Sequence, residues 1–178
     1  MRLFIAIPLP AQARAELMKI QKELLSLSDA ARPVPRENMH ITLRFLGETR
    51  DLAAAAQALS ESVRGFRPFS LHLNRYGCFR QGGGKTAYMG VDGDLDELNA
   101  LFESLDAALF EHGFSREHRR FTPHITLARS VEITDAAEAD MKAIVPNASF
   151  LVNAVELYES SRRSDGKMVY TRLHRASL

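Results

Sequence analysis

The chain has 178 residues, of which 46% are hydrophobic and 25% charged, and its formal net charge is +1. This size and composition fit one globular domain that buries roughly 70% of the surface of its unfolded chain. They argue against a dedicated binder of long duplexes, which is usually more basic, and no stretch reaches the ~20 apolar residues of a membrane span. Cys78 is the only cysteine, which excludes an intrachain disulfide and fits the cytoplasmic location that we expect.

The first half of the chain predicts a strand, a helix, a second strand, a second helix and a hairpin. Their predicted bounds are Leu3–Ile7, Ala11–Ser28, Met39–Leu46, Asp51 or Thr49 to about Arg64, and Leu71–Phe79 with Thr86–Val91. A break is expected over 32–35, where two prolines occur. The triplet at 84–86, Gly-Lys-Thr, resembles the end of a phosphate-binding loop. Strand-like residues follow it, so we interpret it as part of the hairpin.

The second half repeats the pattern of a motif strand followed by a helix and then by a strand pair. The predicted bounds are Leu95–His112 for a helix, His124–Arg129 for a strand, Thr134 or Asp135 to about Ile144 for a helix, and Phe150–Glu159 with Met168–His174 for a hairpin. We therefore interpret residues 1–178 as a single domain with an imperfect internal duplication. Hairpin-joined strands and amphipathic helices predict an α+β fold with antiparallel sheets and helices packed on one face.

The tetrapeptide His-Ile-Thr-Leu occurs twice, beginning at His40 and again at His124. Residues i and i+2 of a strand point to the same face. His40 and Thr42 should therefore project together, and so should His124 and Thr126. Two such strands folded against each other would place two imidazoles and two hydroxyls around one cleft. Two identical copies in similar surroundings favour a functional motif over a chance repetition.

This set of groups suits the cleavage of a phosphoester. A neutral imidazole can take a proton from water while a charged imidazole gives one to the leaving oxygen. Hydroxyls can hold the non-bridging oxygens, where negative charge sits in the transition state. No pair of histidines or cysteines has the spacing of a zinc site, so neither a metal nor a cofactor is predicted.

Phe45 and Arg129 each stand five positions after a motif histidine. Both are flat groups that stack on nucleobases, so we predict that they bind the substrate base. Strict alternation would turn both away from the histidine face, so this prediction needs a twist or bulge at the strand ends, which Gly47 would permit in the first copy. The alternative places Phe45 in the core and Arg129 in a surface ion pair.

With these residues in view, the chain resembles the two-histidine phosphoesterases, and within them the bacterial and archaeal RNA 2′,3′-cyclic phosphodiesterases, also called 2′-5′ RNA ligases. The segments that carry the resemblance are Arg2–Ile7, Glu37–Gly47, Pro123–Arg129, and Leu157–Ser160 with Tyr170. The resemblance implies a bilobed α+β fold. Two pseudo-symmetric lobes would line a central cleft with antiparallel sheets and carry their helices outside.

The resemblance also implies metal-independent opening of a 2′,3′-cyclic phosphate on RNA to a 2′-phosphate. His40 would protonate the leaving O3′, His124 would activate water, and Thr42 and Thr126 would hold phosphate oxygens. Such enzymes also join RNA ends through 2′-5′ linkages by the reverse chemistry. RNA ends with a 2′,3′-cyclic phosphate or a 2′-phosphate are the expected partners, with no membrane and no obligate protein partner.

Two alternatives stay open. The first is a phosphodiesterase that acts on a small cyclic nucleotide or a 2′-5′ oligonucleotide. The second is a module that binds RNA ends without turnover. Intact histidines and threonines in both motifs argue against the second.

Overall fold

A computed structural model describes residues 1–178, the side chain of Gln81 excepted. Its strands are β1 (Arg2–Pro8), β2 (Ala30–Pro33), β3 (His40–Glu48), β4 (Phe69–Gln81), β5 (Gly84–Gly93), β6 (His124–Glu132), β7 (Ser149–Val152), β8 (Ala154–Arg162) and β9 (Met168–Ser177). Its helices are α1 (Ala11–Leu27), α2 (Leu52–Ser62), α3 (Leu95–Glu111) and α4 (Asp135–Ala143), with a 3-10 turn at Arg36–Asn38. The predicted α+β class is confirmed. No helix in the described residues is long and apolar enough to cross a membrane.

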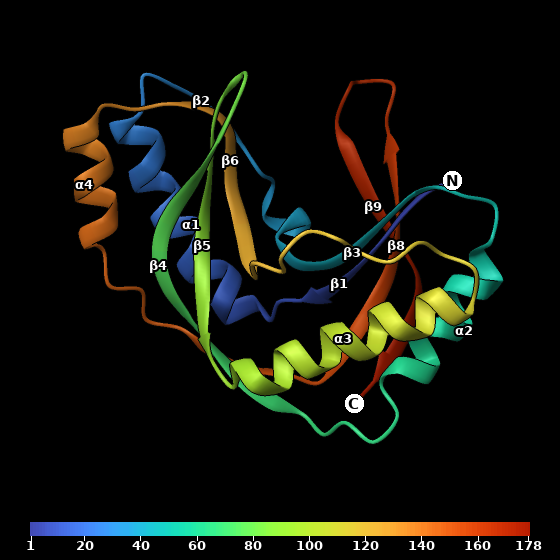
Figure 1. The fold of residues 1–178 in the computed structure, drawn as a ribbon. Coiled ribbons are helices and arrows are strands. Elements are labelled where there is room, and N and C mark those ends of the chain that lie inside the picture. Colours follow the sequence, from blue (N-terminus) through green and yellow to red (C-terminus); the bar gives the residue numbers. More distant parts are fainter.

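The strands form two antiparallel sheets, with the orders β3-β1-β8-β9 and β2-β6-β5-β4-β7. Each sheet holds one motif strand, β3 or β6. The hairpin β4–β5 follows β3 in the chain but joins the sheet of β6, whereas the hairpin β8–β9 follows β6 but joins the sheet of β3 (Figure 1). Neither sheet is therefore built from one half of the sequence alone.

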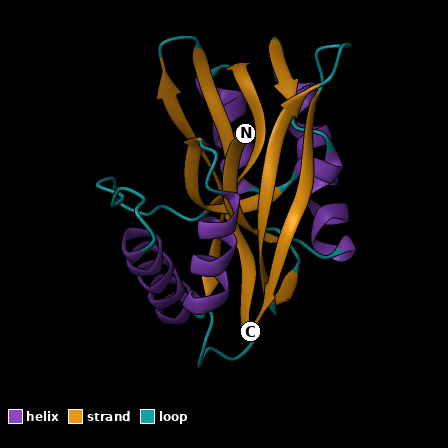
Figure 2. Ribbon diagram, turned by 90° about the vertical axis from the view of Figure 1, so that its right-hand side faces the viewer, coloured by secondary structure: helices purple, strands orange, loops and turns teal.

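Two helices cover each sheet on its apolar side. The pair α2 and α3 packs together, with α2 against β8 and β9, while α1 lies against β2 and β6 and α4 against β4. The strands thus lie between helices on either side (Figure 2). Helix α1 shows why: Leu17, Ile20 and Leu24 recur at helical spacing and are at most 3% exposed. The opposite faces of the sheets are left to the polar motif residues.

Two segments differ from the sequence prediction. The single strand expected over Phe150–Glu159 is wrong, because the chain leaves β7 at Asn153 and continues as β8 in the other sheet. An uninterrupted apolar pattern does not reveal a change of sheet. Helix α1 ends at Leu27, before the expected break over 32–35, but strand β2 over Ala30–Pro33 was not predicted. Its proline, Pro33, is tolerated because β2 lies at a sheet edge, where one row of backbone groups needs no partner.

Candidate active site

The first motif strand carries a one-residue bulge. Strand β1 pairs with Thr42 and then directly with Arg44, which leaves Leu43 without a partner. A bulge inserts one residue and so reverses the alternation of side chains beyond it. Phe45 therefore returns to the face that carries His40. Its side chain is 61% exposed, so the alternative that placed it in the core is wrong.

The second motif strand repeats this irregularity. Strand β5 pairs with Thr126 and then with Ala128, which leaves Leu127 without a partner. Arg129 returns to the face of His124 and is exposed. The bulge that the stacking prediction required is thus present in both copies. It lies within the motif itself, and in each strand the register shifts once more towards the strand end, between Phe45 and Gly47 and between Ala128 and Val131.

The ring of His40 is fixed by hydrogen bonds at both nitrogens. Its Nδ1 lies 2.7 Å from the carbonyl oxygen of Asn38, and its Nε2 lies 2.9 Å from the hydroxyl oxygen of Thr42. A carbonyl only accepts, so Nδ1 must carry the proton. In the neutral ring Nε2 then accepts from the Thr42 hydroxyl. The reactive nitrogen of His40 is therefore Nε2, on the face shared with Thr42.

His124 is held in the same way. Its Nδ1 lies 2.6 Å from the carbonyl oxygen of Thr122, which fixes the proton on Nδ1 and leaves Nε2 as the basic nitrogen. Among the residues described, Thr126 makes no matching bond to the ring. Its hydroxyl is therefore available to an anion at this face.

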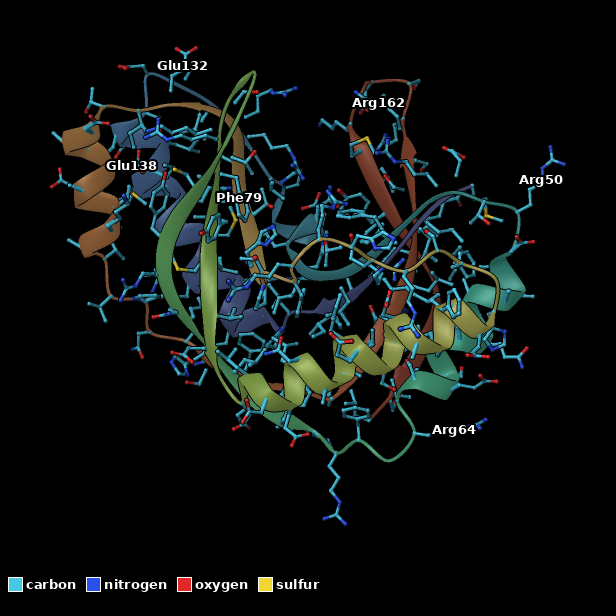
Figure 3. The ribbon with its side chains drawn as sticks, viewed as in Figure 1. Arg50, Arg64, Phe79, Glu132, Glu138 and Arg162 are labelled. Carbon is cyan, nitrogen blue, oxygen red and sulfur yellow. The ribbon has the colours of Figure 1, made fainter. Side chains whose placement is uncertain are left out.

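Aromatic rings surround both imidazoles. Ring centroids of Phe4 and Tyr170 lie 5.0 and 5.5 Å from that of His40. His124 has Phe79 and Tyr88 at 4.9 and 5.4 Å. The sequence analysis assigned no role to these four residues, because their placement depends on strand register across the sheets. Figure 3 labels Phe79 on β4.

Gly77 keeps the ring of Tyr88 in place. A Cβ added at Gly77 would lie 2.4 Å from Cζ of Tyr88, far closer than van der Waals contact. The tyrosine ring therefore lies over the bare backbone of β4. Any side chain at Gly77 would push it from its position beside His124.

Burial and neighbouring cations lower the pKa of both imidazoles in the free protein. Burial lowers the pKa of His40 to about 4, and the charges of Arg129, His124 and Arg14 act in the same direction. Burial also lowers the pKa of His124, again with a contribution from Arg129. The charge of Arg129 thus acts on both histidines.

Strands β3 and β6 contact each other although they belong to different sheets. The four predicted residues His40, Thr42, His124 and Thr126 therefore come from two adjoining strands. Arg14 was not predicted from the sequence, since helical periodicity gives no signal for a cation near the start of α1. The described residues contain no group of three or more His, Cys, Asp or Glu side chains placed to hold a metal ion.

Other polar residues considered for the site are engaged elsewhere. Lys85 forms an ion pair with Glu138 of α4, and the thiol of Cys78 donates to the same carboxylate at 3.2 Å. Burial raises the pKa of Cys78, which makes it a poor nucleophile. Gly84 and Lys85 open strand β5 of the hairpin β4–β5 rather than a helix, so the hairpin interpretation of this triplet is confirmed.

Residues 7–164 match the family described as the 2′-5′ RNA ligase superfamily. A Thermotoga maritima protein named RNA 2′,3′-cyclic phosphodiesterase is 34% identical over 170 residues, covering 93% of this chain and 90% of that protein. An Escherichia coli K12 protein of the same name is 34% identical over 182 residues, covering 99% and 96%. The crystal structure of E. coli LigT with 3′-AMP matches with a TM-score of 0.78 and 31% identity, over 99% of this chain and 97% of that one.

Proposed function

Because the chain belongs to the 2′-5′ RNA ligase superfamily, we propose that it opens 2′,3′-cyclic phosphates at RNA ends to 2′-phosphates. The observation that carries this proposal is the matched pair of histidines on β3 and β6. Each has its Nδ1 proton bound to a carbonyl two residues earlier, so each offers Nε2 to a substrate. The names of the relatives support the same activity.

In the proposed reaction His124 acts as the base and His40 as the acid. Nε2 of His124 takes a proton from water as its oxygen bonds to phosphorus. The bond from phosphorus to O3′ breaks, and O3′ receives a proton from Nε2 of His40. The products are a 2′-phosphate and a free 3′-hydroxyl. Hydroxyls of Thr42 and Thr126 donate to the non-bridging oxygens, where charge accumulates.

The acid role of His40 depends on the substrate. With a pKa of about 4, its imidazole is neutral at pH 7 in the free protein. A phosphate anion beside the ring favours the charged form and raises that pKa. Substrate binding therefore supplies the condition for proton donation. Arg129 opposes this shift until its own charge is neutralised by the same phosphate.

We further propose that catalysis needs no metal and that the same site joins RNA ends through 2′-5′ linkages. In joining, the 5′-hydroxyl of a second RNA end takes the place of water: its oxygen bonds to phosphorus as its proton leaves, the bond from phosphorus to O3′ breaks, and O3′ receives a proton. The opposite step, attack by O3′ with departure of the 5′-hydroxyl, re-forms the 2′,3′-cyclic phosphate. A cytoplasmic location fits an RNA substrate.

The direct test is turnover of a short RNA that ends in a 2′,3′-cyclic phosphate, with EDTA present throughout. The expected product carries a 2′-phosphate and a 3′-hydroxyl. A 3′,5′-cyclic nucleotide and a 2′-5′ oligonucleotide serve as competing substrates. Faster turnover of either one would replace the proposed substrate. Tight binding of the RNA end without turnover would instead support the binding module.

A further inference from the structure

Two rows of side chains cross the sheet β3-β1-β8-β9 on its histidine face. Directly opposed residues of neighbouring strands place their side chains on one face. The register gives one row from Thr42 through Ala6 and Glu156 to Arg175. The second row consists of Phe45, Phe4, Tyr158 and Arg172. Both rows begin at residues of the candidate site and end at an arginine.

The far end of these rows is built around one buried carboxylate. Glu156 is 2% exposed, and its Oε1 accepts from Arg172 at 3.0 Å and from Arg175 at 2.6 Å. The hydroxyl of Tyr158 donates to its other oxygen. Burial acts to raise the pKa of Glu156, but these hydrogen bonds outweigh it and hold the pKa below its ordinary value. Glu156 is therefore an anion that fixes both arginines in place.

This end of the face carries more positive than negative charge. Two arginines share the single carboxylate of Glu156, and their side chains stay 57% and 42% exposed. Arg14 adds a third cation. Its Nε is buried and has no hydrogen-bond partner among the residues that the structure describes. The cluster therefore has an excess of positive charge, which favours the binding of an anion from outside the protein.

Tyr158 lies near two of these cations, since Arg172 is its cross-strand partner on β9 and the charge of Arg14 reaches it. Its ring stacks on Phe4, which in turn lies against His40. Burial, and its bond to Glu156, raise the pKa of Tyr158, while the charges of Arg14 and Arg172 act against that rise. The tyrosine therefore stays uncharged and does not repel an anion. The charge of Arg14 also acts on His40.

We propose that Arg14 and Arg172, both close to Tyr158, bind the phosphodiester that precedes the terminal nucleotide of an RNA strand. The inference rests on the proposed function and specifies its substrate class. The backbones of β3 and β9 lie three strand spacings apart, roughly 14 Å, although Tyr170 of β9 reaches to within 5.5 Å of the His40 ring. Arg172 ends the row that begins at Phe45, so a ligand whose terminal base lies on Phe45 would meet Arg172 with its next phosphodiester. The substrate is accordingly an oligonucleotide end rather than a nucleoside 2′,3′-cyclic phosphate.

The competing explanation is that both sheet arginines serve only to neutralise Glu156. The two explanations differ in what happens to substrates of different length. A merely neutralising arginine affects all substrates alike, through the stability of the fold. A phosphate ligand affects only those substrates that carry the preceding phosphodiester.

The experiment compares kcat/KM for adenosine 2′,3′-cyclic phosphate with that for a dinucleotide ending in the same group. Arg172→Gln and Arg14→Gln remove a charge from the proposed subsite. Arg64→Gln removes one at the end of α2, away from the motif strands (Figure 3), and is the matched control. The wild type should prefer the dinucleotide. Each subsite variant should lower that preference about tenfold or more, the size of a lost hydrogen bond between charged groups.

Salt dependence provides a second readout on the same proteins. For the dinucleotide, the slope of log kcat/KM against log salt should become shallower by about 0.7 in each subsite variant, the value for one lost phosphate contact on a single strand. Equal losses for both substrates, or an unchanged slope, would overturn the proposed subsite. Absence of turnover with either substrate in the wild type would instead overturn the proposed function.

Discussion

Arg44 and Asp106 form a buried ion pair that joins the first motif strand to helix α3. Arg44 directly follows the first motif, and the bulge turns it inward. Its Nη2 also donates to the carbonyl oxygen of Ser115 at 2.8 Å, and Asp106 accepts from the backbone nitrogen of Glu117 at 3.0 Å. The pair thus anchors the loop that leads to His124.

Replacing Asp106 by Ala should therefore destabilise the protein by about 3–5 kcal/mol, because Arg44 would be left as an uncompensated buried charge. Urea unfolding measures this change. Asp96→Ala, in the first turn of the same helix, is the control and should alter stability far less. An apolar pair, Arg44→Met with Asp106→Leu, should recover most of the loss. Equal destabilisation in the single and paired variants would show that the charge is not the cause.

Removal of either motif histidine tests the catalytic proposal. His40→Ala and His124→Ala should each lower kcat by at least ~10²-fold, as expected for a general acid or base. The double variant should be only slightly worse, because the two residues act as a unit. His72→Ala, on the exposed side of β4, is the control.

A substrate with a better leaving group at the 3′ position separates the two roles. It should rescue the variant that lacks the acid, which we expect to be His40→Ala. Rescue of His124→Ala instead would reverse the assignment.

The low pKa of His40 predicts a specific loss of stability in acid. Below pH 6.5 the unfolded chain binds a proton at this histidine, whereas the folded protein does not until the pH nears 4. The free energy of unfolding should therefore fall as pH drops from 6.5 to 4, by up to about 3 kcal/mol from this residue. His124 should add a change of the same sign.

Urea unfolding at several pH values in this window checks that prediction. His40→Gln should depend less on pH than the wild type does, and His118→Gln, in an exposed loop, should match the wild type. Identical pH dependence in all three proteins would show that His40 titrates normally in the fold.

The threonine hydroxyls make a separate prediction. Thr42→Val and Thr126→Val keep the side-chain shape and remove the hydrogen-bond donor. Each should lower kcat/KM by an amount that corresponds to roughly 2–4 kcal/mol of lost transition-state binding. Thr42→Val also removes the bond to Nε2 of His40, so its effect should include a changed pH profile. Thr171→Val, on the exposed side of β9, controls for the substitution. Unchanged kcat/KM in the motif variants would limit these hydroxyls to strand packing.

Sequence periodicity predicted the helices and the motif strands closely, because their apolar residues recur at the spacing of one buried face. The N-cap at Thr134 is an example, since its hydroxyl accepts from the backbone nitrogen of Ala137 at 3.2 Å. The exchange of hairpins between sheets was not predictable in this way. It depends on pairing between distant strands, about which local periodicity carries no information.

The candidate site was only partly accessible from the sequence. The repeated motif identified His40 and His124, whereas the bulges at Leu43 and Leu127 became visible only as strand register. Arg14 lies on α1, and the apolar periodicity of this helix identifies only the residues of its buried face. Its relation to His40 follows from the packing of α1 beside the motif strands.

The bulges lead to the last prediction, that Phe45 and Arg129 hold the terminal base while the histidines work on its phosphate. Both side chains are exposed on the histidine face, and Arg129 acts on both imidazoles. Stacking tolerates any base, so Phe45→Ala should weaken binding of RNA ends by roughly 1–3 kcal/mol without creating a preference among bases. Arg129→Ala should cost more, since its charge also reaches the phosphate. Because Phe45 is 61% exposed, its removal should leave the melting temperature nearly unchanged.

A substrate that lacks the terminal base is the control for this prediction: it should bind the wild type weakly and lose little further affinity with Phe45→Ala. A lower melting temperature with an unchanged KM would assign Phe45 to packing against Phe4 and would remove it from the binding site.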